Sequence, residues 1–138
     1  QPDTLPYYLR GIASIIAATR ESGVGRLLVV GGAGSLEVAP GVQLLDTPQF
    51  PEVYKATAEG ARQALGLLAA EQTLNWTVLS PSAVIAPGER TGDYRLGRDQ
   101  LLTNASGESR ISVEDYAAAM LDELDQPAHP RMRFTVGY

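Results

Sequence analysis

One short stretch constrains the fold more than any other: the apolar run at residues 26–30, which breaks abruptly into Gly31, Gly32, Ala33 and Gly34. Runs of Leu and Val that end in glycine are typical of strands buried on both faces, as in a parallel sheet covered by helices. Glycine lets the backbone turn tightly, or approach another group closely, where such a strand ends. In open α/β sheets ligands bind at the carboxyl ends of the strands, so this turn is the first candidate for a ligand contact.

Three helices are predicted around this run. Apolar residues recur at helical spacing over residues 4–22 and 51–72. Thr4 is the expected N-cap of the first helix, and Gly23 is its expected left-handed C-cap. A third helix is predicted to begin at the N-cap Ser112. Its apolar face is expected to comprise Val113, Tyr116, Ala117, Met120, Leu121 and Leu124.

Two further strands are predicted. Residues 76–79 form a second buried strand, and residues 131–136 alternate between polar and apolar side chains. This alternation predicts a last strand with one more hydrated face. Residues 32–50 are expected to be irregular, with a short extended piece at 42–45. The order of elements indicates an α/β fold in a single domain, residues 1–138.

Composition excludes several classes of function. The chain has 138 residues, no cysteine and a single histidine, His129, so thiolate chemistry, cysteine metal sites and metal sites built on two histidines are excluded. The net charge of −5 offers no strongly basic face, so neither nucleic acid nor an anionic membrane is expected as a partner. No apolar run could span a bilayer and no signal-peptide pattern opens the chain, so a cytoplasmic location is predicted by default.

The glycine turn is not a dinucleotide fingerprint. Such a fingerprint opens directly into a helix whose N-terminus holds the pyrophosphate, whereas the next helix here is predicted only from residue 51. A simple turn after a buried strand and a ligand contact through the backbone of Gly31 and Gly32 are both compatible with the sequence.

Two other groups of residues have alternative interpretations. Lys55 is the only lysine among eleven basic residues, so it is either an ordinary surface residue or a compact ammonium kept for a ligand. Arg90, Arg95 and Arg98 accompany Tyr94 in a glycine-rich loop, residues 87–99. This loop is either a clamp for a phosphate or carboxylate or a hydrated surface loop.

Longer segments resemble a known family. They are RLLVVGGAGSLEVAPG, YKATAEGARQAL, NWTVLSPSAVIAPGERTGDYRLG, SRISVEDYAAAMLDELDQPAH and RFTVGY. Together they resemble the NAD(P)H-binding, atypical short-chain dehydrogenase/reductases, in particular the NADH-flavin reductases and the biliverdin/flavin reductases. The resemblance covers residues 2–138. It implies a Rossmann-like, doubly wound parallel sheet with NADP or NAD at its carboxyl edge. It also implies that these residues are the C-terminal part of the fold, because the family's glycine-rich nucleotide loop has no counterpart here.

The resemblance assigns roles residue by residue. Lys55 matches the active-site lysine that grips the cofactor ribose, and Tyr54 beside it is the second catalytic candidate. The family's Tyr-x-x-x-Lys pair would place its tyrosine at position 51, which is Pro51. Arg90 and Tyr94 match the loop on the substrate side. The cofactor-binding matches are Gly31, Gly32, Ala33, Lys55, Ser80, Pro81, Ser82, Ala83 and Val84.

The resemblance implies an NAD(P)H-dependent oxidoreductase of the flavin-reductase type, which transfers hydride to a planar acceptor such as a flavin or quinone. An alternative is a non-catalytic NADP(H)-sensing module, as among NmrA-like relatives. In the Rossmann strand order, residues 26–30 would pair with residues 76–79 on one side and with a strand absent from this chain on the other. The chain made alone is therefore expected to be poorly folded or to associate with itself, as a homo-oligomer, through that open edge.

Overall fold

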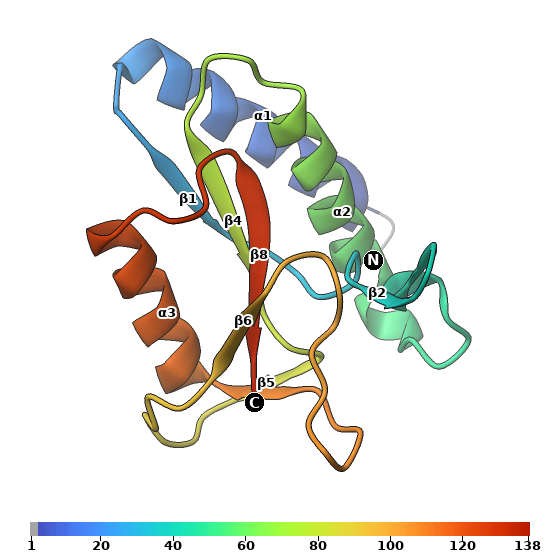
Figure 1. The fold of residues 1–138 in the computed structure, drawn as a ribbon. Coiled ribbons are helices and arrows are strands. Elements are labelled where there is room, and N and C mark those ends of the chain that lie inside the picture. Colours follow the sequence, from blue (N-terminus) through green and yellow to red (C-terminus); the bar gives the residue numbers. More distant parts are fainter. Residues whose placement is uncertain (1–2) are drawn as a thin grey trace.

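The computed structural model describes residues 3–138, and its centre is one mixed sheet (Figure 1). Three parallel strands lie side by side: β1 (Leu27–Val30), β4 (Trp76–Ser80) and β8 (Met132–Gly137). A short strand, β6 (Arg95–Gly97), runs antiparallel to β8 at one edge. The expected pairing of the first two strands is confirmed. β1 forms the other edge, and within residues 3–138 no strand pairs with its outer side. Self-association through this edge stays a prediction.

Helices cover the two faces of this sheet. α1 (Thr4–Ser22) and α2 (Lys55–Ala69) pack together on one face, where Val78 belongs to their core. α3 (Val113–Asp125) packs on the opposite face, against Leu79 and Phe134 (Figure 1). Val78 and Leu79 are adjacent in one strand, so their side chains point to opposite faces. The fold is therefore the predicted Rossmann-like, doubly wound arrangement.

Of the two caps predicted for α1, the C-cap is confirmed and the N-cap is wrong. Gly23 adopts the left-handed conformation expected of a C-cap, with a φ of 75°. Thr4, however, is not the N-cap. It is the first helical residue, and Asp3 before it makes no capping hydrogen bond through its side chain. The helix is held by its buried face instead, which includes Ile12 and Ile16.

The second helix is shorter than predicted. A 3-10 turn, η2 (Glu52–Tyr54), precedes α2, and the helix ends at Ala69 rather than at residue 72. A 3-10 turn has three residues per turn, so it shifts the phase of the helical face. As a result Val53, which lies in this 3-10 turn, is 80% exposed.

The third helix begins as predicted but buries a different face. The Ser112 hydroxyl accepts a hydrogen bond from the Asp115 backbone N–H at 2.9 Å, which confirms the N-cap. The predicted apolar face is wrong at four of its six residues, because Val113, Ala117, Leu121 and Leu124 are exposed. The helix buries Asp115, Tyr116, Ala119 and Glu123. Two carboxylates can lie on the buried face because each has hydrogen-bond partners there.

The hydrated face predicted for the last strand is also wrong. Arg133 and Thr135 are only 6% and 1% exposed. β8 lies inside the sheet, between β4 and β6, and its polar side chains are satisfied by partners. The Thr135 hydroxyl, for example, donates to the Ser80 carbonyl at 2.8 Å. Alternation of polar and apolar residues therefore marks two buried faces of different chemistry here.

Short elements complete the chain. β2 (Glu37–Ala39) and β3 (Val42–Gln43) form a small antiparallel pair, followed by the 3-10 turn η1 (Leu44–Asp46). β5 (Val84–Ala86) pairs in parallel with β7 (Arg110–Ser112). Across residues 3–138, no helix has the length and apolarity that crossing a membrane requires.

Candidate functional site

The carboxyl ends of β1 and β4 open into a cavity of about 740 Å³. The turn Gly31-Gly32-Ala33 lines one part of it, and Pro81 to Val84 line another. These two segments are about fifty positions apart in the sequence and meet because β1 and β4 are neighbours. Seven of the predicted cofactor-binding residues therefore share one cavity.

The glycines of this turn are required by close packing. A Cβ atom at Gly31 would lie 2.5 Å from Val78 Cγ1 on the neighbouring strand. At Gly34 it would lie 3.1 Å from the Ala58 Cβ atom of α2. Small residues on both sides thus bring α2 against the turn, and the Gly31 N–H is held by the Leu79 carbonyl at 2.9 Å. The turn is rigidly placed, and its backbone lines the cavity.

A buried arginine holds the glycine turn in place through hydrogen bonds. The Arg133 Nη1 atom donates to the Ser35 hydroxyl at 2.8 Å and to the Ser80 hydroxyl at 3.1 Å. Its Nε atom also donates to Asp99 at 3.1 Å. Ser80, a predicted cofactor contact, is buried and does not line the cavity. It joins the end of β4 to the turn after β1 instead.

The segment after β4 is held from its far side. The Ser82 hydroxyl donates to the Val136 carbonyl at 2.8 Å, and the Ala83 N–H donates to the Ser109 hydroxyl at 2.9 Å. Ser82 is buried, whereas Ala83 and Val84 are exposed toward the cavity side. This part of the wall therefore presents mainly small apolar groups to a ligand.

Three aromatic side chains complete the lining of the cavity: Tyr8 of α1, Phe50, and Tyr54 of η2. Tyr54 was a predicted site residue, but the other two were not. No local signal in the sequence distinguishes a residue of the core from one that lines a cavity.

Lys55 lies outside this cavity. It lines an adjoining depression of about 550 Å³, together with Asp46, Glu59 and Arg62. Its Nζ atom is 3.0 Å from the Glu52 carboxylate, and 46% of its side chain is exposed. Arg62 lowers the pKa of Glu59 through their hydrogen bond, so this depression is dominated by a fixed ion pair. The structure thus separates Lys55 from the glycine turn, while the role predicted for it stays a prediction.

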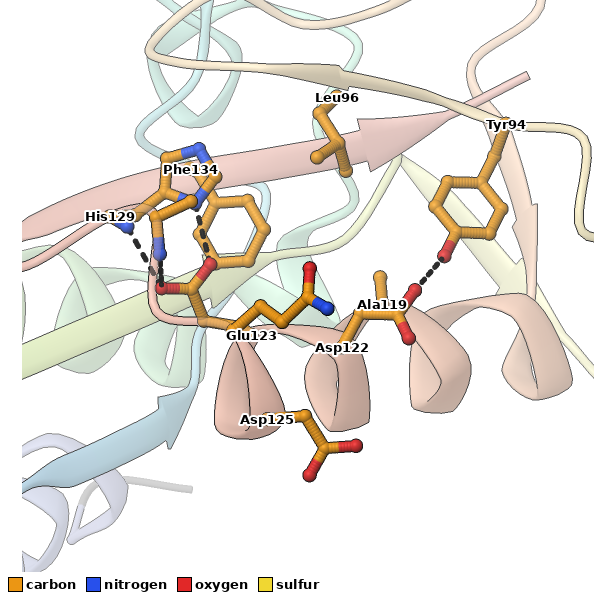
Figure 2. A pocket seen from close by; sticks show the side chains of 10 residues that line it. Tyr94, Leu96, Ala119, Asp122, Glu123, Asp125, His129 and Phe134 are labelled. Atoms are coloured by element: carbon orange, nitrogen blue, oxygen red, sulfur yellow. Dashed lines mark hydrogen bonds and ion pairs between the residues drawn. The ribbon is translucent and has the colours of Figure 1, made fainter.

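Arg90 and Tyr94 also lie apart from the main cavity. Tyr94 lines a smaller cavity of about 320 Å³ over α3, where its hydroxyl donates to Asp122 at 3.1 Å (Figure 2). Burial and this hydrogen bond raise the pKa of Tyr94. In the same cavity Glu123 accepts a hydrogen bond from the His129 backbone and contacts its ring (Figure 2).

The loop that carries Arg90 is closed by Asp115. This carboxylate accepts hydrogen bonds from the backbone of Thr91 and Gly92, at 2.9 and 3.0 Å, and from the Tyr138 hydroxyl at 2.6 Å. Burial alone would raise the pKa of Asp115, but these hydrogen bonds outweigh burial and lower the pKa to about 2. No local signal in the sequence indicates that Asp115, in the first turn of α3, binds this loop.

Comparison with known proteins identifies the family. The model of the NAD(P)H-binding family matches residues 3–127, and the chain belongs to this family. The uncharacterized protein YwnB of Bacillus subtilis (strain 168) is 47% identical over 126 residues, which are 89% of this chain and 59% of YwnB.

Solved structures show the same architecture. A candidate exported protein from Burkholderia pseudomallei has a TM-score of 0.91 at 47% identity, over 97% of this chain and 65% of that one. A candidate NADH-flavin reductase from Streptococcus pneumoniae TIGR4 has a TM-score of 0.85 at 39% identity, over 99% and 66%. A short-chain dehydrogenase/reductase from Veillonella parvula, solved in complex with NADP, has a TM-score of 0.70 at 25% identity, over 92% and 57%. The chain therefore spans about three fifths to two thirds of the length of these relatives.

Proposed function

We propose that this chain holds the nicotinamide and adjoining ribose of NADP or NAD in the main cavity. We further propose that it serves an oxidoreductase that transfers hydride to a planar acceptor, such as a flavin or quinone. The observation that carries the proposal is the convergence of the turn Gly31-Gly32-Ala33 and the segment Pro81 to Val84 on one cavity. Membership of the NAD(P)H-binding family, and the relatives described as an NADH-flavin reductase and an NADP complex, support it.

The residues present fit the nicotinamide half of such a cofactor. The cavity, at about 740 Å³, lies within the usual range for small-molecule sites. The part of its wall formed by the glycine turn and by residues 81–84 consists of backbone and small groups, which suit the face of a flat ring. When bound, the reduced cofactor would supply the hydride, and this chain would orient the nicotinamide and exclude water. No nucleophilic side chain is required for that chemistry.

We assign no residue of this chain to the pyrophosphate of the cofactor. Within residues 3–138 the glycine turn leads into β2, and α2 begins only at Lys55. No helix N-terminus follows the turn directly to hold a phosphate. The proposed contacts are therefore limited to the nicotinamide and its ribose.

A turnover assay tests the function. NADPH or NADH is mixed with the chain and riboflavin or menadione, and oxidation is followed at the absorbance band of the reduced cofactor. Steady oxidation above the uncatalysed rate supports the oxidoreductase. Cofactor binding without oxidation favours a sensing module instead, and the absence of both binding and oxidation contradicts the proposal for this chain.

A further inference from the structure

The aromatic part of the cavity has no role in holding the nicotinamide as proposed above. Tyr8, Phe50 and Tyr54 come from two segments more than forty residues apart, yet they line the same cavity as the glycine turn. The hydride acceptor must lie against the nicotinamide, because hydride transfer requires contact between the two reacting rings. The aromatic side chains are therefore the available wall for that acceptor.

The fold makes a specific place for Tyr8. It packs on Gly60, where a Cβ atom would lie 2.7 Å from the Tyr8 Cγ atom. Glycine inside a helix is destabilising, yet α2 keeps one at this buried position, and only glycine leaves room for the ring. Its neighbour Tyr7 is 73% exposed and does not line the cavity. Two adjacent tyrosines on α1 thus have different environments.

The Tyr8 hydroxyl is available to a ligand. Tyr8 lines the cavity, and its hydroxyl takes part in no hydrogen bond among residues 3–138. Burial raises the pKa of Tyr8, so the phenol keeps its O–H for donation.

We propose that Tyr8, Phe50 and Tyr54 form the acceptor subsite, which takes a planar conjugated ring bearing a carbonyl group, and that the Tyr8 O–H donates a hydrogen bond to that carbonyl. This inference rests on the proposed function. When hydride adds to the acceptor ring, the dihydronicotinamide is oxidised and negative charge develops on the carbonyl oxygen, which then takes a proton from water. A hydrogen-bond donor at that oxygen stabilises the charge as it develops, while the aromatic faces hold the ring by stacking.

Substitutions at Tyr8 separate the ring from the hydroxyl. With riboflavin as acceptor and saturating NADPH, we expect Tyr8→Ala to raise the acceptor KM about tenfold, because a stacking face is lost. Tyr8→Phe keeps the ring on Gly60, so it should lower kcat about fivefold or more with a nearly unchanged acceptor KM. The KM for NADPH should stay within about twofold of wild type in both. Tyr7→Phe is the matched control and should behave as wild type.

A binding measurement separates this inference from the proposed function. Riboflavin emission is quenched when the ring stacks on tyrosine, so titration with the chain reports binding without turnover. If the wild type binds riboflavin and Tyr8→Ala weakens binding, but NADPH is never oxidised, the oxidoreductase proposal fails and the subsite stands. If NADPH is oxidised and both Tyr8 variants match the wild type, the subsite is overturned and the function stands. Loss of riboflavin binding in Tyr7→Phe as well would also overturn it. Emission of Trp76, the one tryptophan, checks that each variant is folded.

Discussion

Two glycine-containing loops of this molecule, residues 31–35 and 88–92, have opposite environments. In residues 31–35 the glycines pack against β4 and α2, and their backbone faces a cavity. In residues 88–92 the backbone N–H groups are taken up by carboxylates: Gly88 donates to Glu114 at 2.9 Å, and Thr91 and Gly92 donate to Asp115. The first loop therefore leaves space for a ligand, whereas the second is closed by the protein itself.

The comparison shows that glycine in a loop indicates a packing or conformational requirement of the backbone and does not by itself indicate a ligand site. Both loops need glycine, the first for close packing and the second for a positive φ of 73° at Gly92. The two loops differ in whether a side chain from a distant part of the chain accepts hydrogen bonds from their backbone N–H groups. Asp115 does so in the second loop, and Arg133 holds the first loop through Ser35 without filling the cavity.

Removing Asp115 should have the largest effect. Asp115→Ala leaves the N–H groups of Thr91 and Gly92 and the hydroxyls of Thr91 and Tyr138 without their acceptor. We expect a loss of about 3 kcal/mol or more in the free energy of unfolding, measured with urea. Asp93→Ala, at an exposed position of the same loop, is the control and should change it by less than about 0.5 kcal/mol. Equal small effects for both variants would mean that the loop is not held by Asp115.

The same carboxylate should give the molecule an acid dependence. The folded pKa of Asp115, about 2, lies below its ordinary value of 3.8. A depressed pKa contributes stability that is fully present above about pH 4 and is lost as the pH falls through 2, about 2 kcal/mol in total. The gap in unfolding free energy between wild type and Asp115→Asn should therefore narrow between pH 6 and pH 2.5. A gap independent of pH would contradict the charge-based account.

Substitutions at two glycines of α2 test the packing of Tyr8 against this helix. Gly60→Ala brings a Cβ atom to 2.7 Å from the Tyr8 ring, whereas a Cβ atom at Gly66 meets nothing within 4 Å. Both substitutions improve helix propensity by about 1 kcal/mol. Only the substitution at Gly60 also overpacks its surroundings, which costs about 1–3 kcal/mol. We expect Gly66→Ala to raise the thermal midpoint and Gly60→Ala to lower it. A rise in both would show that Tyr8 moves aside freely.

A substitution at Lys55 tests whether the bound cofactor reaches from the cavity into the adjoining depression. If its ammonium reaches the cofactor ribose, Lys55→Met should weaken NADPH binding or slow turnover about tenfold. Glu52→Gln breaks the same exposed ion pair but keeps the ammonium, so it should leave both unchanged. Unchanged kinetics in Lys55→Met would assign this lysine to the surface.

Arg90 should have the smallest effect. Neither Arg90 nor Tyr94 lines the main cavity, and the neighbouring backbone is held by Asp115. Arg90→Ala is therefore expected to change the acceptor KM by less than about twofold, a difference below 0.5 kcal/mol. A large rise in acceptor KM with unchanged cofactor affinity would show that this loop contacts the acceptor after all, as the family resemblance implied.

Local signals in the sequence predicted the three helices and the three parallel strands of the fold. The strand 26–30, the left-handed cap at Gly23 and the N-cap at Ser112 depend on residues within a few positions of one another. The order of these elements also implied a parallel sheet covered on both faces. Helix ends and faces were less predictable, since η2 and the buried Asp115 and Glu123 depend on packing.

The candidate site required the tertiary structure for a physical reason. Its contacts join residues far apart: Arg133 and Ser35 are 98 positions apart, and Asp115 and Thr91 are 24 apart. Periodicity and capping describe forces between near neighbours, so they predict where a strand or helix forms but not which side chain will meet a distant donor. The residues predicted at the glycine turn and after β4 came together because adjacent parallel strands end at one edge. Tyr8 joined them only because α1 packs on Gly60, a contact that no local pattern encodes.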